Sequence, residues 1–203
     1  MSKSKIWLEK TIKYLRELSI VVIGVAITLS ASYWITSMNE KRDMQLYLNA
    51  IKLEMKDNIE LVNILIGELE QSVGYADYLQ THDKKSLNID SIQSYKCYYY
   101  VSVFAYQRDA FEMFKSLGFM RLMEDKSLLR DIWSVYNKLD ELQAALELSN
   151  QIKLEEIKKE IFLDKKKDFI PMYQFYTSTR IPYNMYNEYK KLLDTLNRIA
   201  EIL

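Results

Sequence analysis

Two residues of this sequence could form a cysteine nucleophile and its base, and each residue type occurs once. Cys97 lies in an aromatic run, and His82 lies in a polar stretch at 80–94. A thiol beside an imidazole is the arrangement of a cysteine nucleophile and its base, but a lone cysteine among aromatic residues is more typical of a small buried apolar side chain. The sequence has no Gly-x-Ser-x-Gly motif, and zinc sites need several cysteine or histidine ligands. We therefore expect no enzymatic activity, no cofactor and no metal site.

A second group of polar residues lies beside a glycine that is expected to end a helix. In Lys115-Ser116-Leu117-Gly118, glycine supplies the positive φ that helix C-termini adopt, so the next helix can fold back antiparallel. This structural role explains the turn without any function. Beside it, Arg108, Asp109, Glu112 and Lys115 form a polar surface, and we interpret Arg108, Glu112 and Lys115 as candidate contacts for a partner.

The sixteen tyrosines of the sequence are concentrated in 95–106 and 173–189. Tyrosine is enriched at interfaces because it adds a large contact area and a polar group. Tyr173 and Tyr176 are therefore candidate residues of a partner surface. The same tyrosines suit a core in which each hydroxyl has a hydrogen-bond partner, and the sequence leaves both interpretations open.

Charge and composition exclude several classes of function. The 28 basic and 28 acidic residues balance. The first 17 residues carry five basic and two acidic side chains, a net charge of 5 − 2 = +3, which leaves −3 for the remainder. A chain without a basic face does not neutralise phosphates, so we expect no nucleic-acid partner. One cysteine forms no intramolecular disulfide. Four glycines and two prolines allow few turns and predict an all-α chain of long helices.

Residues 18–39 contain no formal charge over twenty-two positions. At 1.5 Å per residue, about 20 helical residues cross the ~30 Å hydrocarbon core of a bilayer. Three interpretations are an uncleaved single-pass anchor, a cleaved signal peptide with small residues at Ser30-Ala31-Ser32, and a buried helix of a soluble core. We favour the anchor, because the apolar run continues through Trp34 and Ile35, past the possible cleavage point.

The charges that flank the apolar segment predict its orientation. Residues 1–17 carry +3, whereas residues 40–60 carry four basic and five acidic side chains, 4 − 5 = −1. Positive flanks are retained in the cytoplasm. We expect a cytoplasmic segment at 1–17, a transmembrane helix at 18–39 in the inner membrane, and an extracytoplasmic (periplasmic) helical domain at 40–203.

Aromatic residues lie where the membrane–water interfaces are expected. Tyr33 and Trp34 lie near the outer end of the span, and Trp7 lies on the apolar face of a segment, 1–17, that is either an interfacial amphipathic helix or a short disordered tail. We interpret all three as interface anchors, with the lipid bilayer as a partner.

Small side chains form a stripe within the predicted span, at Gly24, Thr28, Ala31 and Ser32. Such stripes let helix backbones approach closely in lipid. The stripe either packs against a second helix or faces lipid with its hydroxyl groups bonded to carbonyls one turn earlier.

Helical periodicity dominates the rest of the chain and predicts a bundle of about four helices with up-and-down neighbours. Nothing breaks the helix after the span, so the transmembrane helix is expected to continue into a long helix to about residue 79. A heptad seam follows at Leu48, Ile51, Met55, Asn58, Val62, Leu65 and Leu69. A second seam follows Pro182, at Met185, Tyr189, Leu192, Leu196, Ile199 and Leu203. The two seams are expected to pair with each other or between protomers as a coiled coil.

The segments between these helices are predicted to be less regular. Residues 80–94 are expected to form a loop with His82 exposed. Aromatic and β-branched residues at 95–106 suit a strand, but the helical context favours a helix that ends at Gly118. Asp125 is expected to cap the helix that follows, and 168–181 is expected to be irregular.

Two strings of the sequence contain recognisable motifs. The first, residues 15–43, contains Val21-Val22-Ile23-Gly24, Trp34 and Asn39-Glu40-Lys41-Arg42. The second, residues 108–136, contains Lys115-Ser116-Leu117-Gly118, Trp133 and Tyr136. Both strings resemble an uncharacterised family of bacterial single-pass inner-membrane proteins with a VVIG-containing transmembrane segment. The resemblance covers most of 10–140 and leaves out the C-terminal third. It implies a retained anchor and carries over no catalytic residue.

These observations give two functional hypotheses. The first is a membrane-anchored, non-enzymatic interaction or assembly protein that forms a homo-oligomer or binds a membrane-protein partner. The alternative is an extracytoplasmic helical bundle that senses a ligand and acts through a membrane partner, because a cytoplasmic segment of about 17 residues is too short for an output domain.

Overall fold

The computed structural model describes residues 3–95, 101–162, 170 and 172–203, and describes side chains at 12–88, 90–95, 101–159, 170 and 172–203. Cys97 lies outside the described residues, and the side chain of Trp7 lies outside the described side chains. The chain is all-α, as predicted, with no strand among the described residues. Its elements are α1 (Lys3–Thr81), the 3-10 turn η1 (Lys84–Ser86), α2 (Ile89–Ser94), α3 (Asp109–Ser116), the 3-10 turn η2 (Phe119–Arg121), α4 (Lys126–Phe162), α5 (Tyr173–Ser178) and α6 (Ile181–Ile202).

The chain divides into two compact units, Met1–Leu46 and Tyr47–Leu203. The first unit is formed by the N-terminal part of α1. The uncharged segment 18–39 lies entirely within this helix, and α1 is helical on both sides of Asn39, as the sequence predicted.

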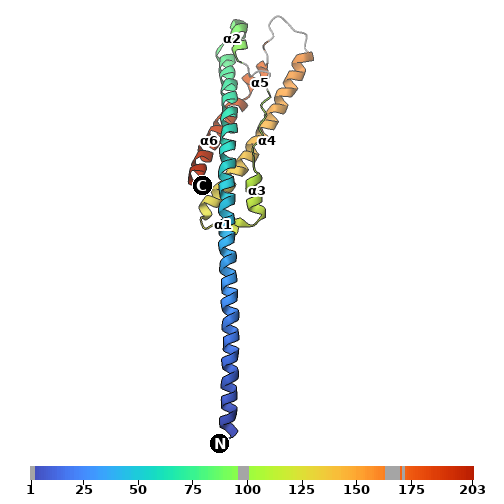
Figure 1. Cartoon of the computed structure of the whole chain (residues 1–203). Coiled ribbons are helices and arrows are strands. Elements are labelled where there is room, and N and C mark those ends of the chain that lie inside the picture. The colour runs from blue at the N-terminus through green and yellow to red at the C-terminus, as the bar shows by residue number, and fades with distance from the viewer. Residues whose placement is uncertain (1–2, 96–100, 163–169, 171) are drawn as a thin grey trace. The chain divides into compact units, whose positions relative to one another are not determined.

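The second unit is a helical bundle built on the C-terminal part of α1 together with α4 and α6 (Figure 1). Helices α4 and α6 are antiparallel neighbours. Lys138 on α4 binds Glu188 on α6 at 3.0 Å, and Asp131, two turns earlier on α4, binds Arg198, later on α6, at 3.0 Å.

Helices α1 and α4, in contrast, run in the same direction. Glu54 of α1 accepts a hydrogen bond from Tyr136 of α4, and further along both helices Gln80 and Lys153 contact Tyr176. The prediction of up-and-down neighbours is therefore wrong for this pair. The physical reason lies in residues 101–107, which precede α3 and are not helical. They run back along the bundle from Asn150, late on α4, to Asn58 on α1.

Both predicted seams are buried in the core of the second unit. Each position from Leu48 to Leu69 of the first seam is at most 8% exposed, and the second seam is buried from Met185 to Ile199. The seams therefore form the interior of this unit, where burial of each large apolar side chain contributes about 1.5–3 kcal/mol.

Residues 101–107 have no helical structure, so the prediction of a helix there is wrong. Two asparagine side chains bind this segment from the flanking helices. Asn58 of α1 accepts from the Gln107 amide and donates to the Gln107 carbonyl, both at 2.7 Å, and Asn150 of α4 donates to the Ser102 carbonyl at 2.6 Å. These side-chain amides satisfy backbone groups that a helix would have satisfied internally.

A buried carboxylate fixes the start of α3. Arg108, the N-cap residue, makes no capping bond of its own. Glu54 of α1, only 6% exposed, accepts instead from the Ala110 amide at 2.7 Å and from the Tyr136 hydroxyl. An anion at a helix N-terminus binds exposed amides and complements the helix dipole, so Glu54 connects α1, α3 and α4.

Several predicted helix ends are confirmed. Gly118 ends α3 with φ of +72°, the Asp125 carboxylate accepts from the Ser127 and Leu128 amides at 2.9 Å, and Pro182 lies in the first turn of α6. Two segments are more regular than predicted, because the loop at 80–94 contains α2 and the region at 168–181 contains α5.

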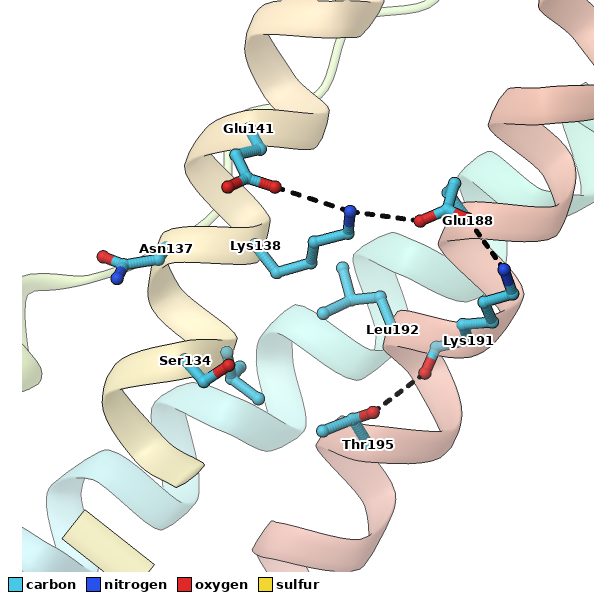
Figure 2. A pocket seen from close by; sticks show the side chains of 9 residues that line it. Ser134, Asn137, Lys138, Glu141, Glu188, Lys191, Leu192 and Thr195 are labelled. Carbon is cyan, nitrogen blue, oxygen red and sulfur yellow. Dashed lines mark hydrogen bonds and ion pairs between the residues drawn. The ribbon is translucent and has the colours of Figure 1, made fainter. Parts of the chain in front are cut away.

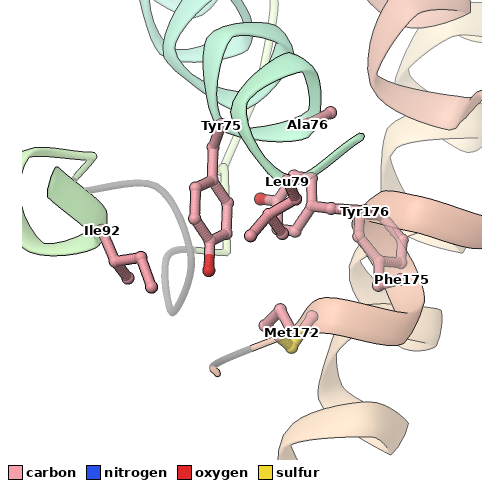
Figure 3. Close-up of a cluster of buried hydrophobic side chains, with 7 residues drawn as sticks. All are labelled: Tyr75, Ala76, Leu79, Ile92, Met172, Phe175 and Tyr176. Carbon is pink, nitrogen blue, oxygen red and sulfur yellow. The ribbon is translucent and has the colours of Figure 1, made fainter. Parts of the chain in front are cut away.

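A second apolar cluster lies where α1 ends, between α2 and α5 (Figure 3). Tyr75 and Tyr176 are fully buried there, with their rings in an edge-on contact at 4.9 Å. Elsewhere in the core, the Tyr189 hydroxyl donates to the Leu142 carbonyl at 3.0 Å. Tyr176 and Tyr189 of the 173–189 region are thus core residues, in agreement with one of the two interpretations. Tyr95 of the 95–106 region is half-buried against the same cluster.

Asn58→Ala is expected to lower the free energy of unfolding by about 2–4 kcal/mol, because each orphaned buried polar group costs about 1–3 kcal/mol. The measurement is urea denaturation of the full-length chain in detergent, followed by circular dichroism. Asn63→Ala is the matched control, since exposed Asn63 bonds only the Ile59 carbonyl of its own helix. Equal effects of the two substitutions would contradict the proposed role of Asn58.

Candidate functional site

The most distinctive surface of the first unit is the apolar part of α1. This helix is the one candidate span among the described residues, with the length and composition of a single membrane span or a signal anchor, and none of its most apolar window is buried. Large apolar side chains are more than half exposed on every face: Leu18, Ile20, Val21, Val22, Ile23, Val25, Ile27, Leu29, Ile35 and Met38. A core helix of a soluble protein buries at least one face, so this segment is not part of such a core in this chain.

The predicted interface and stripe residues lie along the same helix. Tyr33 and Trp34 are 78% and 66% exposed. The Thr28 hydroxyl donates to the Gly24 carbonyl at 2.9 Å. This is the hydrogen bond, one turn earlier in the same helix, that a lipid-facing threonine is expected to make. A methyl group placed on Gly24 would meet no atom within 4 Å, so this face is open to a neighbouring helix or to lipid.

In the second unit the structure brings together Arg108, Glu112 and Lys115, as predicted. Arg108 binds Asp140 of α4 at 2.8 Å and also binds Glu112, and Lys115 binds Glu112 at 2.7 Å. Tyr106 donates to Asp140 and accepts from Arg108 at 3.1 Å. The two positive and two negative side chains satisfy one another, and because they are 36–49% exposed, each pair contributes at most about 1 kcal/mol.

The network shifts the protonation equilibria of its members. Partial burial and the hydrogen bond to Asp140 raise the pKa of Tyr106 to about 12. Hydrogen bonds from Lys115 and Arg108 lower the pKa of Glu112. Both shifts favour the charge states that hold the network together, so the cluster acts as a structural tie between the 101–108 segment, α3 and α4.

The predicted partner surface does not extend to Tyr176. This residue is fully buried, and its carbonyl accepts from Gln80, so its assignment to a surface is corrected: its ring fills the core between α1 and α5. Tyr173 is half-buried, with the Lys84 ammonium 5.0 Å from its ring centre.

A groove of about 380 Å³ lies between α4 and α6 (Figure 2). Its charged side chains bind one another: Lys138 lies 3.0 Å from Glu188 and 3.4 Å from Glu141, and Lys191 lies 2.9 Å from Glu188. Since these charges are paired, the groove does not offer an ionic ligand an uncompensated partner.

The described part of the chain contains no candidate metal site and no candidate site built on His82. No group of three or more His, Cys, Asp or Glu side chains is arranged there to hold a metal ion. His82 is exposed, as predicted, and its Nδ1 lies 2.9 Å from the Tyr78 carbonyl in its own helix.

Sequence reasoning missed the buried polar residues that position the cluster. Glu54 was not singled out, because one glutamate among many on a helix carries no signal of burial. Asn58 did carry a signal, since it interrupts an otherwise apolar seam, and the structure shows that its amide binds the backbone of Gln107.

Comparisons with known proteins give no relative for this chain. No protein-family model matches the sequence, and neither the curated proteins nor the solved structures yield a significant match. The resemblance of residues 15–43 and 108–136 to a bacterial membrane-protein family therefore stays a prediction.

Stability is expected to fall as the pH rises through the titration of Tyr106. Its pKa is about 10 when unfolded and about 12 when folded, so the contribution of the neutral phenol is complete below about pH 10 and is lost towards about pH 12. Urea denaturation of the full-length chain at several pH values between about 10 and 12 measures the slope of the unfolding free energy against pH. Tyr106→Phe should reduce this slope without abolishing it, because burial also raises the pKa of Tyr183 and of Tyr189. Tyr14→Phe, at a position 72% exposed, should leave the slope unchanged. An unchanged slope in Tyr106→Phe would contradict this linkage.

Proposed function

We propose that this chain is a membrane-anchored, non-enzymatic interaction or assembly protein. In this proposal, residues 18–39 span the inner membrane once, residues 1–17 lie in the cytoplasm, and the helical domain at 40–203 lies outside it. The observation that carries the proposal is the exposure of uncharged apolar side chains around the whole circumference of α1. In water, each large apolar side chain would forgo about 1.5–3 kcal/mol of burial free energy, and a bilayer supplies that burial.

The orientation is supported by the charges on either side of the span. The N-terminal flank of 17 residues carries +3, and the flank at 40–60 carries −1. Basic residues are retained on the cytoplasmic side, and exposed Tyr33 and Trp34 suit the opposite interface.

Assembly through the heptad seams is not supported by the fold, because both seams are buried inside the second unit. The surface that supports assembly is the open stripe at Gly24, Thr28, Ala31 and Ser32, where helix backbones can approach closely. We therefore propose that self-association, or docking to a membrane-protein partner, uses the span.

Ligand sensing, the alternative function, has weaker support. The α4–α6 groove is the feature that such a function would use, and its lysines and glutamates pair with one another (Figure 2). We place this function second, because binding an ionic ligand there would require breaking those pairs.

Ile27→Arg with Leu29→Arg is expected to abolish membrane insertion. Each arginine at the centre of a span costs about 2.5–3.5 kcal/mol of insertion free energy. The measurement is the fraction of full-length chain that stays in the membrane pellet after an alkaline carbonate wash. Leu53→Arg with Ile64→Arg is the matched control, because these residues of α1 are equally exposed but lie outside the span. Full retention of the Ile27/Leu29 variant would overturn the anchor.

Gly24→Ile is expected to convert an oligomer in detergent to a smaller species, because a β-branched side chain separates the helix backbones that the stripe brings together. Native mass spectrometry of the detergent-extracted chain measures the change. Gly67→Ile serves as the control, since Gly67 also meets open space and lies outside the span. A wild-type chain that is strictly monomeric and has no co-purifying partner would count against assembly.

A further inference from the structure

A second groove, of about 460 Å³, lies along η2 and the first turns of α4. Its principal lining side chains are Met120, Lys126, Leu129, Arg130 and Trp133. The four residues from α4 are spaced at i, i+3, i+4 and i+7, which places them on one face of the helix. This face alternates two cations with two apolar side chains and contributes no carboxylate to the groove.

The two cations of this groove have no ion-pair partner in the described part of the chain. The Lys126 ammonium lies 3.3 Å from the Met120 carbonyl and 3.4 Å from the Arg121 carbonyl, and the Arg130 guanidinium lies 3.4 Å from the Ser127 hydroxyl. These partners are neutral and the contacts are long, so most of the donor capacity of both cations remains available for an anion. The paired lysines of the α4–α6 groove differ in this respect.

Trp133 is held at the groove with part of its indole exposed. One side of the ring makes an edge-on contact with Phe111 at 5.8 Å, and the Lys115 ammonium lies 5.7 Å from its centre. The side chain remains 40% exposed. A partly exposed tryptophan suits the boundary between lipid acyl chains and water, where indoles are enriched in membrane proteins.

The residues beside this groove lie close in sequence to the proposed span. Phe119 of η2 packs against Tyr47, the first residue of the second unit, with tilted rings whose centres are 5.2 Å apart. Tyr47 follows Asn39 by eight residues in the sequence, so only a short stretch of chain connects this unit to the proposed span.

We propose that the η2–α4 groove binds a phospholipid of the membrane in which the chain is anchored. Lys126 and Arg130 hold the lipid phosphate, and Trp133, Leu129 and Met120 contact the glycerol region and the start of the acyl chains. This site rests on the proposed function, because it takes its ligand from the bilayer that residues 18–39 are proposed to span.

The test uses tryptophan fluorescence of the full-length chain in lipid nanodiscs. Trp7→Phe with Trp34→Phe leaves Trp133 as the single tryptophan, because the sequence has three. Nanodiscs of phosphatidylcholine and phosphatidylglycerol with brominated acyl chains should quench Trp133 relative to unbrominated discs. Adding Lys126→Gln and Arg130→Gln should abolish most of this quenching. Lys138→Gln with Lys191→Gln, which removes the paired lysines of the other groove, should leave it unchanged.

A second chain, with Trp7→Phe and Trp133→Phe, separates this inference from the proposed function. Trp34 is then the single tryptophan, and bromolipid should quench it if residues 18–39 span the bilayer. Quenched Trp34 with unquenched Trp133 would overturn the lipid site alone, and would also be the result if the groove binds an acidic protein segment instead. Unquenched Trp34 would overturn the anchor itself. Equal quenching of Trp133 with and without the two cations would overturn the phosphate contact.

Added inorganic phosphate should not reduce the quenching of Trp133, and a reduction would assign the groove to the free anion.

Discussion

The central physical constraint on this protein is an apolar helical surface with nothing to cover it. Between residues 18 and 39, side chains that carry no charge point outward on every face of α1. Folding of the rest of the chain does not remove this surface from water, because the second unit builds its own core from other residues. We therefore propose that this segment lies in a bilayer, and each functional proposal depends on that location.

The second unit shows how an all-α fold accommodates a segment that is not helical. Residues 101–107 lie among three helices, and their backbone depends on side chains from α1 and α4 for hydrogen bonds. Asn58 and Glu54, one turn apart on α1, bind the end of this segment and the first amides of α3. Buried polar groups of this kind stabilise a fold only when each one has a partner. These two residues connect α1 to the backbone on either side of Arg108, and Asp140 connects α4 to Arg108 itself.

Periodicity predicted the long helices and both seams, because a helix that buries one face has apolar residues at regular intervals in its sequence. The turn at Gly118 and the cap at Asp125 were predicted from the local preferences of single residues. Neither signal was sufficient where the partners come from distant parts of the chain. The non-helical path of 101–107 depends on Asn58 and Asn150, 49 and 48 residues away from their respective contacts. The burial of Tyr176 depends on the packing of α5 against α1. The Arg108 cluster was located in sequence, but its ties to Asp140 and Tyr106 required the fold.

The most direct test of the anchor is a reporter enzyme that is active only outside the cytoplasm, fused after Leu203 and assayed in intact cells with fractionation of the fusion. The account predicts an active fusion that stays in the membrane fraction at its full length. An inactive fusion would contradict the orientation, and an active fusion recovered as a shortened, soluble protein would show that the apolar segment is a cleaved signal rather than an anchor.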